Sequence, residues 1–508
     1  MKSVDGPMSR YGYFYYFCMG NKNRLNAGFP EPMEEPFEPN FDSETLSLVK
    51  RFEKTLQQGQ RLFFDIDEFE EIIEYYFFKN DQRKALLTIR QALEQHPGCI
   101  QLQLKLAQSH INSNKEKDAL RILKETDHIT TGESDIHLSR GNLYSQLEEP
   151  EKAISAYKQA VNGAEFPDDL YSNIAFEYEN LGNYDKAIDY LLKALAVNPE
   201  NDPALYEFSF CCEVSQQTGR SISFLLDFID QYPYSIAAWF NLGIAYSNQE
   251  LYEKAIEAYD FVLAIDETFS SAYFNKANCY ANIGNYDKAI ETYFETFFHE
   301  EPEPVTYYYI AECYEKQKKF NLAIEHYQKS IGLDPDFADA WLGMGICNDE
   351  LGKPQTAIPY IQKALKLAPS VPEYWFILGD ILIRLQRIDE GIAAYRKVTE
   401  LDPEDTDIWL ELSVVYADQK DYENAAKVLQ EGLHHHELQP DLYYYLAYCL
   451  FLSGKTREAE ENLHRALQLN FEGHKQLFTT FPEAALFPAI VDGIEAFKVN
   501  LTDNPQTT

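Results

Sequence analysis

The feature that most constrains this chain is a repeat with a fixed period of 34 residues. The string GNYDKAI begins at Gly182 and again, unchanged, at Gly284, which is 102 residues or three periods further on. With Ala187 placed at position 20, twelve consecutive units run from residue 66 to residue 473 without an insertion or deletion. A period of this length indicates an array of small units that bury their apolar faces by stacking on one another.

Small residues recur at two positions of the unit. Position 8 is Gly, Ala or Ser in every unit except the first, where Ile73 stands, and position 24 is always large and apolar, as in Leu191 and Tyr259. Two antiparallel helices approach closely where small side chains meet, and the large residue fills the space beside them. The residues at position 20 are all small: Ala85, Ala119, Ala153, Ala187, Ser221, Ala255, Ala289, Ala323, Ala357, Gly391, Ala425 and Ala459.

Each unit divides into two amphipathic helices, A and B. Positions 4, 7, 8 and 11 share one helical face, as do positions 17, 20, 24 and 27. Between these two sets, Gly182 and Asn183 form a loop that ends the first helix of their unit. Pro199, at position 32, cannot continue the second helix and marks the exit turn. The repeated string is therefore predicted to be the inter-helix turn and the closely packed start of helix B.

These units resemble tetratricopeptide repeats, and the resemblance covers about four-fifths of the chain. It implies an all-α fold, a right-handed superhelix of antiparallel helix pairs in which the A helices line a concave groove and capping helices close the ends. The opening segment Phe63–Phe77 resembles that of Bacteroidetes tetratricopeptide repeat proteins, which makes Met33 an alternative start of the chain. The unit Asp202–Ser235 is the least regular, with Ser209 and Ser221 at its small positions, and we expect looser packing there.

The segments outside the array are short. Residues 1–40 are predicted to be a disordered or doubtful N-terminal segment, with a stiff acidic linker at Pro30–Pro39. Residues 41–65 are predicted to hold a capping helix from Ser43 to about Gln58 and to lead into the repeats. Residues 66–473 are the twelve units, and residues 474–508 are a C-terminal cap and tail too short for a catalytic domain.

Composition excludes several classes of function. The net charge of −38 argues against nucleic acid, because phosphate binding draws on clustered Lys and Arg, and it argues against an anionic membrane surface. No stretch approaches eighteen consecutive apolar residues, so membrane insertion is not expected. The eight cysteines lack a CxxC pair, which favours a reducing, cytoplasmic location. Cys211, Cys279, Cys313, Cys347 and Cys449 all occupy position 10, which is typical of packing.

No motif for catalysis is present. The chain lacks HExxH, GxxxxGK[ST], GxSxG and a Gly-rich dinucleotide loop. The histidine cluster His434–His436 falls at the end of a B helix, where consecutive side chains point in different directions and cannot all reach one ion. We therefore predict no enzymatic activity, no catalytic residue, no cofactor and no metal site.

The predicted groove is acidic. In tetratricopeptide repeats, positions 2, 5, 6, 9, 12 and 13 of helix A face the concave side. Of the 72 such positions here, twenty carry Asp or Glu and three carry a cation, namely Lys105, Lys316 and Arg384. The clamp of Lys and Arg that binds the C-terminal carboxylates of chaperones is missing. An acidic lining favours a protein or peptide partner that is basic, or mixed basic and apolar.

Amides and aromatic rings gather in the middle of this predicted groove. An Asn amide both donates and accepts, so it can pair with a peptide group whatever the side chain, and the rings could hold apolar side chains. The Asn series resembles the ladder in the superhelix of O-linked N-acetylglucosamine transferase, although it is interrupted at Glu207. Alternatively, these side chains are merely solvated or pack between adjacent A helices. The predicted partner-binding residues are Asn142, Asn173, Tyr206, Phe210, Phe240, Asn241, Phe274, Asn275, Asn278, Tyr308 and Tyr309.

Three functions fit these observations. The favoured one is a non-enzymatic scaffold whose concave groove binds an extended or helical segment of a partner protein. The first alternative is a structural subunit of a homo-oligomer or a larger assembly. The second is a regulatory arm for an enzyme on another chain. The sequence does not name the partner or the oligomeric state.

Overall fold

A computed structural model describes residues 43–58, 62–126, 134–164 and 167–503. These residues form α-helices and two short 3-10 helices, and they contain no strand. They belong to two compact units, Met1–Asp266 and Glu267–Thr508. The predicted all-α fold is confirmed. The proposed start at Met33 and residues 1–40 lie outside the described residues, and the predicted domain boundaries stay a prediction.

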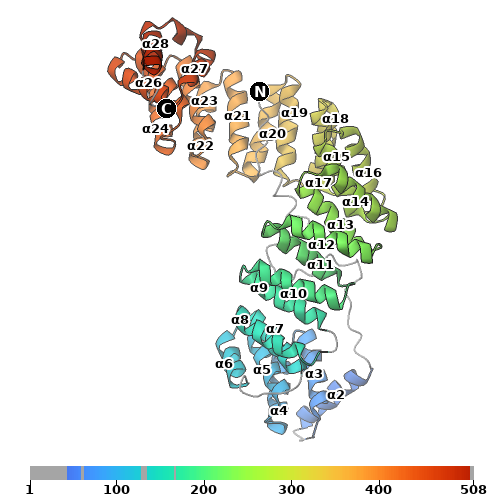
Figure 1. Cartoon of the computed structure of the whole chain (residues 1–508). Coiled ribbons are helices and arrows are strands. Elements are labelled where there is room, and N and C mark those ends of the chain that lie inside the picture. The colour runs from blue at the N-terminus through green and yellow to red at the C-terminus, as the bar shows by residue number, and fades with distance from the viewer. Residues whose placement is uncertain (1–42, 59–61, 127–133, 165–166, 504–508) are drawn as a thin grey trace. The chain divides into compact units, whose positions relative to one another are not determined.

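In the first compact unit, six helix pairs follow α2 (Ser43–Gln58), the helix predicted at that place. Successive pairs stack one after another within the unit (Figure 1). The A helices are α3 (Ile66–Phe78), α5 (Ile100–Ile111), α7 (Ser134–Gln146), α9 (Asp168–Asn180), α11 (Asp202–Val214) and α13 (Ile236–Asn248). The B helices are α4 (Gln82–Gln95), α6 (Glu116–Thr126), α8 (Pro150–Val161), α10 (Tyr184–Val197), α12 (Thr218–Gln231) and α14 (Tyr252–Ile265).

The second compact unit holds six further pairs and a closing element. Its A helices are α15 (Ser270–Asn282), α17 (Pro304–Lys316), α19 (Ala338–Glu350), α21 (Pro372–Arg384), α23 (Thr406–Asp418) and α25 (Pro440–Leu452). Its B helices are α16 (Tyr286–Thr296), α18 (Phe320–Leu333), α20 (Pro354–Leu367), α22 (Ile388–Leu401), α24 (Tyr422–His435) and α26 (Thr456–Leu469). The closing element is η1 (Phe471–Gly473), α27 (His474–Thr480), η2 (Pro482–Leu486) and α28 (Pro488–Asp503).

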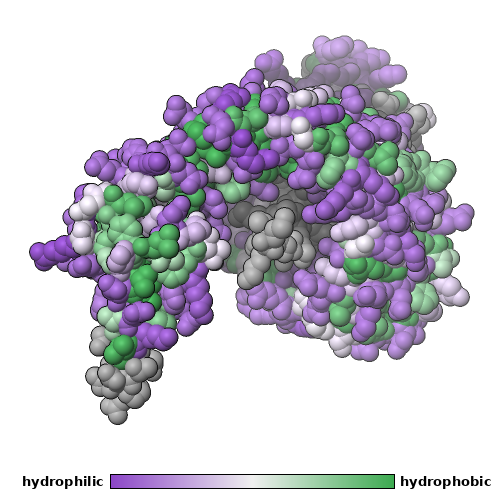
Figure 2. Space-filling view, turned by 90° about the horizontal axis from the view of Figure 1, so that it is seen from above, coloured by the Kyte–Doolittle hydropathy of each residue, from purple (hydrophilic) through white to green (hydrophobic). Residues whose placement is uncertain are grey.

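The small residues lie where the two helices of a pair meet. All twelve residues at position 20 are buried. A Cβ atom added to Gly141 or Gly243, at position 8, would come within 2.4 or 2.5 Å of the ring of Tyr157 or Tyr259, at position 24 of the same repeat. The large residue therefore fills the space that the missing side chain leaves, as the sequence predicts. Figure 2 shows hydrophilic residues over most of the visible surface, with hydrophobic residues in small groups between them.

The turn between helices A and B has one backbone conformation throughout the array. Position 15 has a positive φ in all twelve repeats, occupied by glycine in four and by another residue in eight. Gly284 has φ of 80° and Lys420 has φ of 61°. At the next position, the side chain of Asn285 accepts a hydrogen bond from the Lys288 amide at 3.4 Å and begins helix B. The letters G and N of the repeated string are thus a left-handed turn residue and a helix cap.

Tryptophan holds the turn between successive repeats. All four Trp residues occupy position 4, and each indole N–H donates to the carbonyl of the proline six residues earlier. In Trp341 this bond to Pro335 is 2.9 Å long. Because the bond joins helix A to the exit turn of the preceding repeat, it fixes where the next pair begins.

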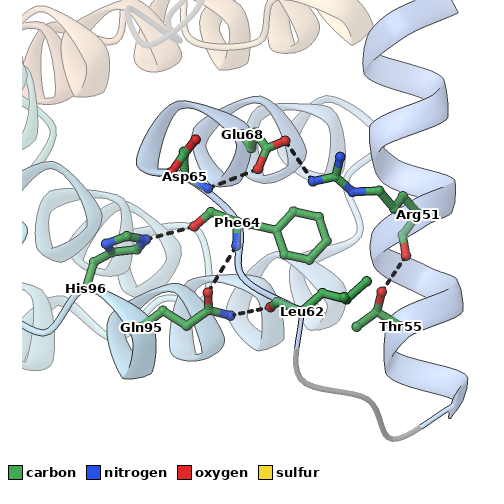
Figure 3. A network of polar contacts seen from close by, with 8 residues as sticks. All are labelled: Arg51, Thr55, Leu62, Phe64, Asp65, Glu68, Gln95 and His96. Atoms are coloured by element: carbon green, nitrogen blue, oxygen red, sulfur yellow. Dashed lines mark hydrogen bonds and ion pairs between the residues drawn. The ribbon is translucent and has the colours of Figure 1, made fainter.

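The N-terminal end of the array is covered by α2. Phe52 is 2% exposed and its ring meets the rings of Phe64 and Phe69 edge to face. Figure 3 shows the surrounding polar contacts, in which Arg51 pairs with Glu68 at 2.7 Å and the His96 ring bonds to the Phe64 carbonyl at 2.8 Å. These contacts tie α2 and the segment before α3 to the end of α4.

The closing element covers the last pair in a similar way. The ring of Phe481 lies 4.6 Å from that of Tyr448, and the hydroxyls of Tyr445 and Thr480 are 2.6 Å apart. Leu477 and Ile490 are buried in the same core cluster as residues of α25 and α26. The apolar edge of the last repeat is therefore not left open to water.

The pair α11 and α12 packs more loosely, as expected from its sequence. Its two helices approach each other less closely than those of the other pairs among the described residues. Ser209 and Ser221 replace Ala or Gly at the small positions, and the hydroxyls of both are buried without a hydrogen-bond partner among the described residues. A ring contact of 4.6 Å between Phe208 and Phe224 fills much of the space between the helices.

Because the two helices of a pair approach closely, a larger residue at position 20 should lower the stability of the fold. Ala289 is 0% exposed. Ala289→Leu should lower the free energy of unfolding by about 1–3 kcal/mol, because the added carbons have no space between α15 and α16. Chemical denaturation followed by circular dichroism measures this. Glu291→Leu, at an exposed position of the same helix, is the control, and an equal loss there would contradict the explanation.

The left-handed turn predicts that the protein becomes more stable when glycine replaces another residue at position 15. Lys420 is exposed and has φ of 61°. Lys420→Gly should raise the free energy of unfolding by about 0.5–1 kcal/mol, because glycine adopts this conformation without a clash of its Cβ atom. Lys420→Ala removes the same side chain but keeps Cβ, so it should bring no such gain in the same denaturation experiment. Equal stability of the two variants would argue against the backbone explanation.

Candidate functional site

The A helices of the second compact unit, Glu267–Thr508, carry acids at the same position of successive repeats. We use "A-helix face" for positions 2, 5, 6, 9, 12 and 13 of the A helices. Position 2 of α19, α21, α23 and α25 holds Asp339, Glu373, Asp407 and Asp441, which we call the acidic stripe. Glu373 and Asp407 are exposed, and Asp339 and Asp441 are half-buried. The stripe runs across four successive helix pairs.

The acids of the stripe influence one another. Burial raises the pKa of Glu373, and the charge of Asp339 raises it further. Burial likewise raises the pKa of Asp441, with a contribution from Asp407. Among the described residues, Glu373, Asp407 and Asp441 form no ion pair. The carboxyls of Glu373 and Asp441 therefore each sense an acid of the neighbouring repeat.

A second acidic group lies on α17. Burial raises the pKa of Glu312 to about 7, although the Tyr308 hydroxyl donates to its carboxylate at 3.1 Å and lowers the value. The charges of Glu315 and Asp339 raise it, and Lys316 lowers it. The Glu315 carboxylate accepts a hydrogen bond from the Tyr327 hydroxyl at 2.9 Å. A cation brought to this position would favour the ionised form of Glu312.

The few cations of the A-helix face are mostly paired. Arg384 contacts Asp349 at 2.5 Å and Asp380 at 3.1 Å, and Lys105 pairs with Glu74. Lys316 is exposed. The face therefore keeps an excess of negative charge after its internal ion pairs are counted.

The predicted binding residues of the first unit have different surroundings. Asn142 is exposed and accepts a hydrogen bond from the Tyr157 hydroxyl at 2.9 Å. Asn241 is 3% exposed, and its amide nitrogen donates to the Ala237 carbonyl of its own helix at 2.8 Å. Phe240 is also buried and its ring contacts that of Tyr206 on the neighbouring A helix. For Phe240 and Asn241 the structure favours packing between A helices. The half-buried members of this set are Asn173, Tyr206 and Phe210.

The predicted binding residues of the second unit form a connected group. The buried ring of Phe274 meets that of Tyr309 at 5.6 Å, and Tyr309 meets Tyr308 at 5.4 Å. Asn278 accepts a hydrogen bond from the Tyr293 hydroxyl, and the half-buried Asn275 donates to its own helix. These side chains support one another, so much of their hydrogen-bonding capacity is already used inside the protein.

Cysteine and histidine do not assemble into a reactive group in the described residues. The five cysteines at position 10 are buried and form no disulfide among the described residues, and burial raises the pKa of Cys313 and of Cys449 to about 12. His435 stacks on the ring of Trp409. No group of three His, Cys, Asp or Glu side chains that could hold a metal ion is found in this part of the chain. None of its helices is long and apolar enough to cross a membrane.

Comparison with family models identifies the repeats. Models of the tetratricopeptide repeat match residues 169–201, 236–269 and 134–162. The chain is a tetratricopeptide repeat protein. A model described as the Cilia and flagella-associated protein 70 C-terminal domain matches residues 264–479 of it. A comparison with curated protein sequences gave no match. This class of repeat supports protein–protein interaction scaffolds in general.

Solved structures similar to this tetratricopeptide repeat protein include the C-terminal part of a repeat protein from Cytophaga hutchinsonii. It is 20% identical, with a TM-score of 0.40, over 46% of this chain and 95% of that one. A repeat protein from Parabacteroides merdae is 14% identical, with a TM-score of 0.39, over 48% and 96%. Cut9–Hcn1 of the APC/C is 17% identical, with a TM-score of 0.38, over 80% and 93%. The resemblance to Bacteroidetes proteins stays a prediction.

The acidic stripe is the feature that the sequence reasoning missed. Counting acids over the whole A-helix face gave the correct excess of charge but not its arrangement. The signal is present in the sequence, since position 2 is acidic in each of the last four repeats. Comparing one position across repeats would have found it.

The raised pKa of Glu312 predicts a dependence of stability on pH. The folded protein keeps a proton on Glu312 up to about pH 7, whereas the unfolded chain loses it near the ordinary value of 4.5. This group therefore lowers the free energy of unfolding as the pH rises between these values. Glu312→Gln cannot ionise, so its stability relative to the wild type should increase by about 2–3 kcal/mol over that range.

Urea denaturation at pH 5 and pH 8 tests this expectation about Glu312. The control is Glu291→Gln, at an exposed position, which should show no such trend. A stability difference for Glu312→Gln that stays constant between the two pH values would contradict the assignment.

Proposed function

We propose that this protein is a non-enzymatic scaffold that binds a basic, or mixed basic and apolar, segment of a partner protein along the A-helix face of its second unit. The observation that supports this most directly is the acidic stripe. Acids in register over four helix pairs present a row of negative charge, which an extended segment or a helix with regularly spaced cations can follow.

The electrostatics favours a cationic partner. Burial raises the pKa of both Glu373 and Asp441, and the charges of Asp339 and Asp407 raise it further, so neighbouring acids repel one another in the unbound protein. A Lys or Arg of the partner placed between these carboxylates removes the repulsion and adds charge-assisted hydrogen bonds. The binding free energy then includes relief of the repulsion.

Apolar side chains beside the stripe support a partner segment that carries both basic and apolar residues. Phe376, at position 5 of α21, is 36% exposed and stacks on Tyr395 at 5.4 Å. Ile346 and Ile377 are half-buried on the same face. A segment that alternates cations with Leu or Ile could therefore bury apolar surface while its charges reach the stripe.

The Asn and aromatic residues predicted from the sequence remain part of this proposal as a secondary contact region. The exposed or half-buried members are better candidates than the buried ones, because they can reach a peptide without a change of packing. The candidates that we retain are Asn142, Asn173, Tyr206, Phe210, Asn275, Asn278, Tyr308 and Tyr309. The predicted cytoplasmic location is retained as well, and none of the seven described cysteines forms a disulfide.

A peptide-binding experiment tests the proposed role of the acidic stripe. The probe is a fluorescent peptide of alternating Lys and Leu, and its partner probe replaces Lys by Glu. Fluorescence anisotropy should show binding of the Lys peptide alone. Neutralising the stripe with Glu373→Gln, Asp407→Asn and Asp441→Asn should raise the Kd by about tenfold to a hundredfold, because three charge contacts are lost.

The matched control neutralises three exposed acids on B helices, namely Asp389→Asn, Glu423→Gln and Glu460→Gln. This variant has the same net charge as the stripe variant but keeps the stripe, so it should bind like the wild type. Equal weakening in both variants would mean that only the overall charge matters, and the proposed site would be abandoned.

A further inference from the structure

On α4, α6 and α14 the B helix exposes a face that internal packing does not use. Positions 18, 22 and 25 are three or four residues apart, so their side chains form one row along helix B. We call this set the outward row of each B helix. On these three helices the row is exposed, whereas positions 20 and 24 on the same helix are buried. The charge of the outward row differs between the B helices of the first compact unit.

The outward rows of the first two B helices are basic. On α4 the row is Arg83, Leu87 and Arg90, and on α6 it is Lys117, Arg121 and Lys124; all six are exposed. We call these six residues the basic patch. Residues 79–126 contain nine Lys or Arg and five Asp or Glu, in a chain whose net charge is −38. The patch therefore lies in a locally positive region of a strongly negative protein.

Cations of both helices act on the imidazole of His110, which lies on the intervening helix α5. Burial lowers the pKa of His110, and although Asp118 raises it, Arg121 of α6 and Arg90 of α4 both lower it. One imidazole thus senses cations from both helices. Arg83, Arg90, Lys117 and Lys124 form no ion pair with any described residue. Arg121 lies 3.8 Å from Asp118, and Glu116 and Glu125 are the other acids of α6.

The same three positions are acidic further along the first unit. On α14 the outward row is Glu253, Glu257 and Asp260, and all three are exposed. We call it the acidic patch. Lys254 is next to this row and lies over the ring of Tyr246, 5.5 Å from its centre. The same repeat positions thus carry acids on α14 and, apart from Leu87, cations on the B helices α4 and α6.

Apolar side chains accompany both patches. Leu87 is 45% exposed within the basic patch, and Phe261 is 51% exposed next to Asp260. Phe261 is held in place by stacking on Trp239, with ring centres 4.2 Å apart. Charge fixes the orientation of two surfaces, and apolar contact of this kind excludes water between them.

We propose that copies of this chain associate with one another, with the basic patch of one copy contacting the acidic patch of the next. Five cations then face three carboxylates, and Leu87 and Phe261 meet at the contact. Two copies can exchange both contacts and close into a dimer, or each copy can contact a different neighbour, in which case each copy at the end of the assembly keeps one unused patch. In the second case, association grows with concentration beyond a dimer unless the assembly closes into a ring.

Sedimentation velocity of the full chain at increasing concentration tests this proposal. The wild type should form larger species as the concentration rises. Arg83→Glu, Arg90→Glu, Lys117→Glu and Lys124→Glu together should abolish them, with the Kd of association rising about a hundredfold or more. The matched control is Lys353→Glu, Lys366→Glu, Lys427→Glu and Arg465→Glu, at exposed positions of the second unit. It carries the same net charge and should associate like the wild type.

A charge swap identifies the partner surface. Glu253→Lys, Glu257→Lys and Asp260→Lys together should also prevent association. An equimolar mixture of this variant with the basic-patch variant should associate again, because the unchanged basic patch of one meets the unchanged acidic patch of the other, and the new carboxylates meet the new lysines. Circular dichroism checks that each variant is folded, and substitution by Gln at the four cations provides a milder version of the first variant.

Three outcomes would overturn the proposal. A wild type that stays monomeric at every concentration shows that the two patches do not bind each other. Equal loss of association in the matched control shows that total charge alone acts. A mixture that fails to associate shows that α14 is not the complementary surface. Neutralising the acidic stripe of the second unit should leave self-association unchanged, so the failure of the proposed function and the failure of this inference are distinguishable.

Discussion

The close approach of two helices through small side chains is the contact on which the rest of this structure depends. A residue without a large side chain at positions 8 and 20 lets helices A and B lie close enough for the ring at position 24 to reach across, as Tyr157 does over Gly141 and Tyr259 over Gly243. All twelve residues at position 20 are buried, so close contact at this position recurs along the array, although α11 and α12 pack more loosely. Dense packing of this kind leaves few alternatives to the observed pairing.

Backbone conformation keeps this contact in register along the chain. A left-handed residue at position 15 reverses the chain after helix A, and the indole of Trp341 and its equivalents holds the exit turn after helix B. Eight repeats adopt the left-handed turn without glycine, so packing of the helices overrides a local preference that is unfavourable for an L-residue. Because each repeat has the same length, one position lies on the same face in every repeat, and a row such as the acidic stripe can form.

Most of the fold could be predicted from the sequence, but the burial of individual side chains could not. The period, the small residues and the turn letters fixed the helices and their pairing, and even α2 follows its predicted bounds. The exposure of Phe240, Asn241 and Phe274 was harder to predict, because positions 5 and 6 are covered to an extent that depends on the rings of the neighbouring A helix. The ring of Tyr206 contacts Phe240 and that of Tyr309 contacts Phe274. These two phenylalanines, which were predicted to contact a partner, therefore pack inside the protein.

The division between packed and free positions explains how an acidic protein can hold separate surfaces of opposite sign. Positions 8, 20 and 24 carry the free energy of packing, so a charge at position 2 or in an outward row changes stability little. Such a charge does change the long-range field, and the net charge of −38 makes copies repel one another, a repulsion that a local basic region opposes at short range. The basic patch on α4 and α6 is that region. Its Arg and Lys residues are not needed to hold the helices together, so their concentration at one end of the first unit is better explained by an intermolecular contact than by folding.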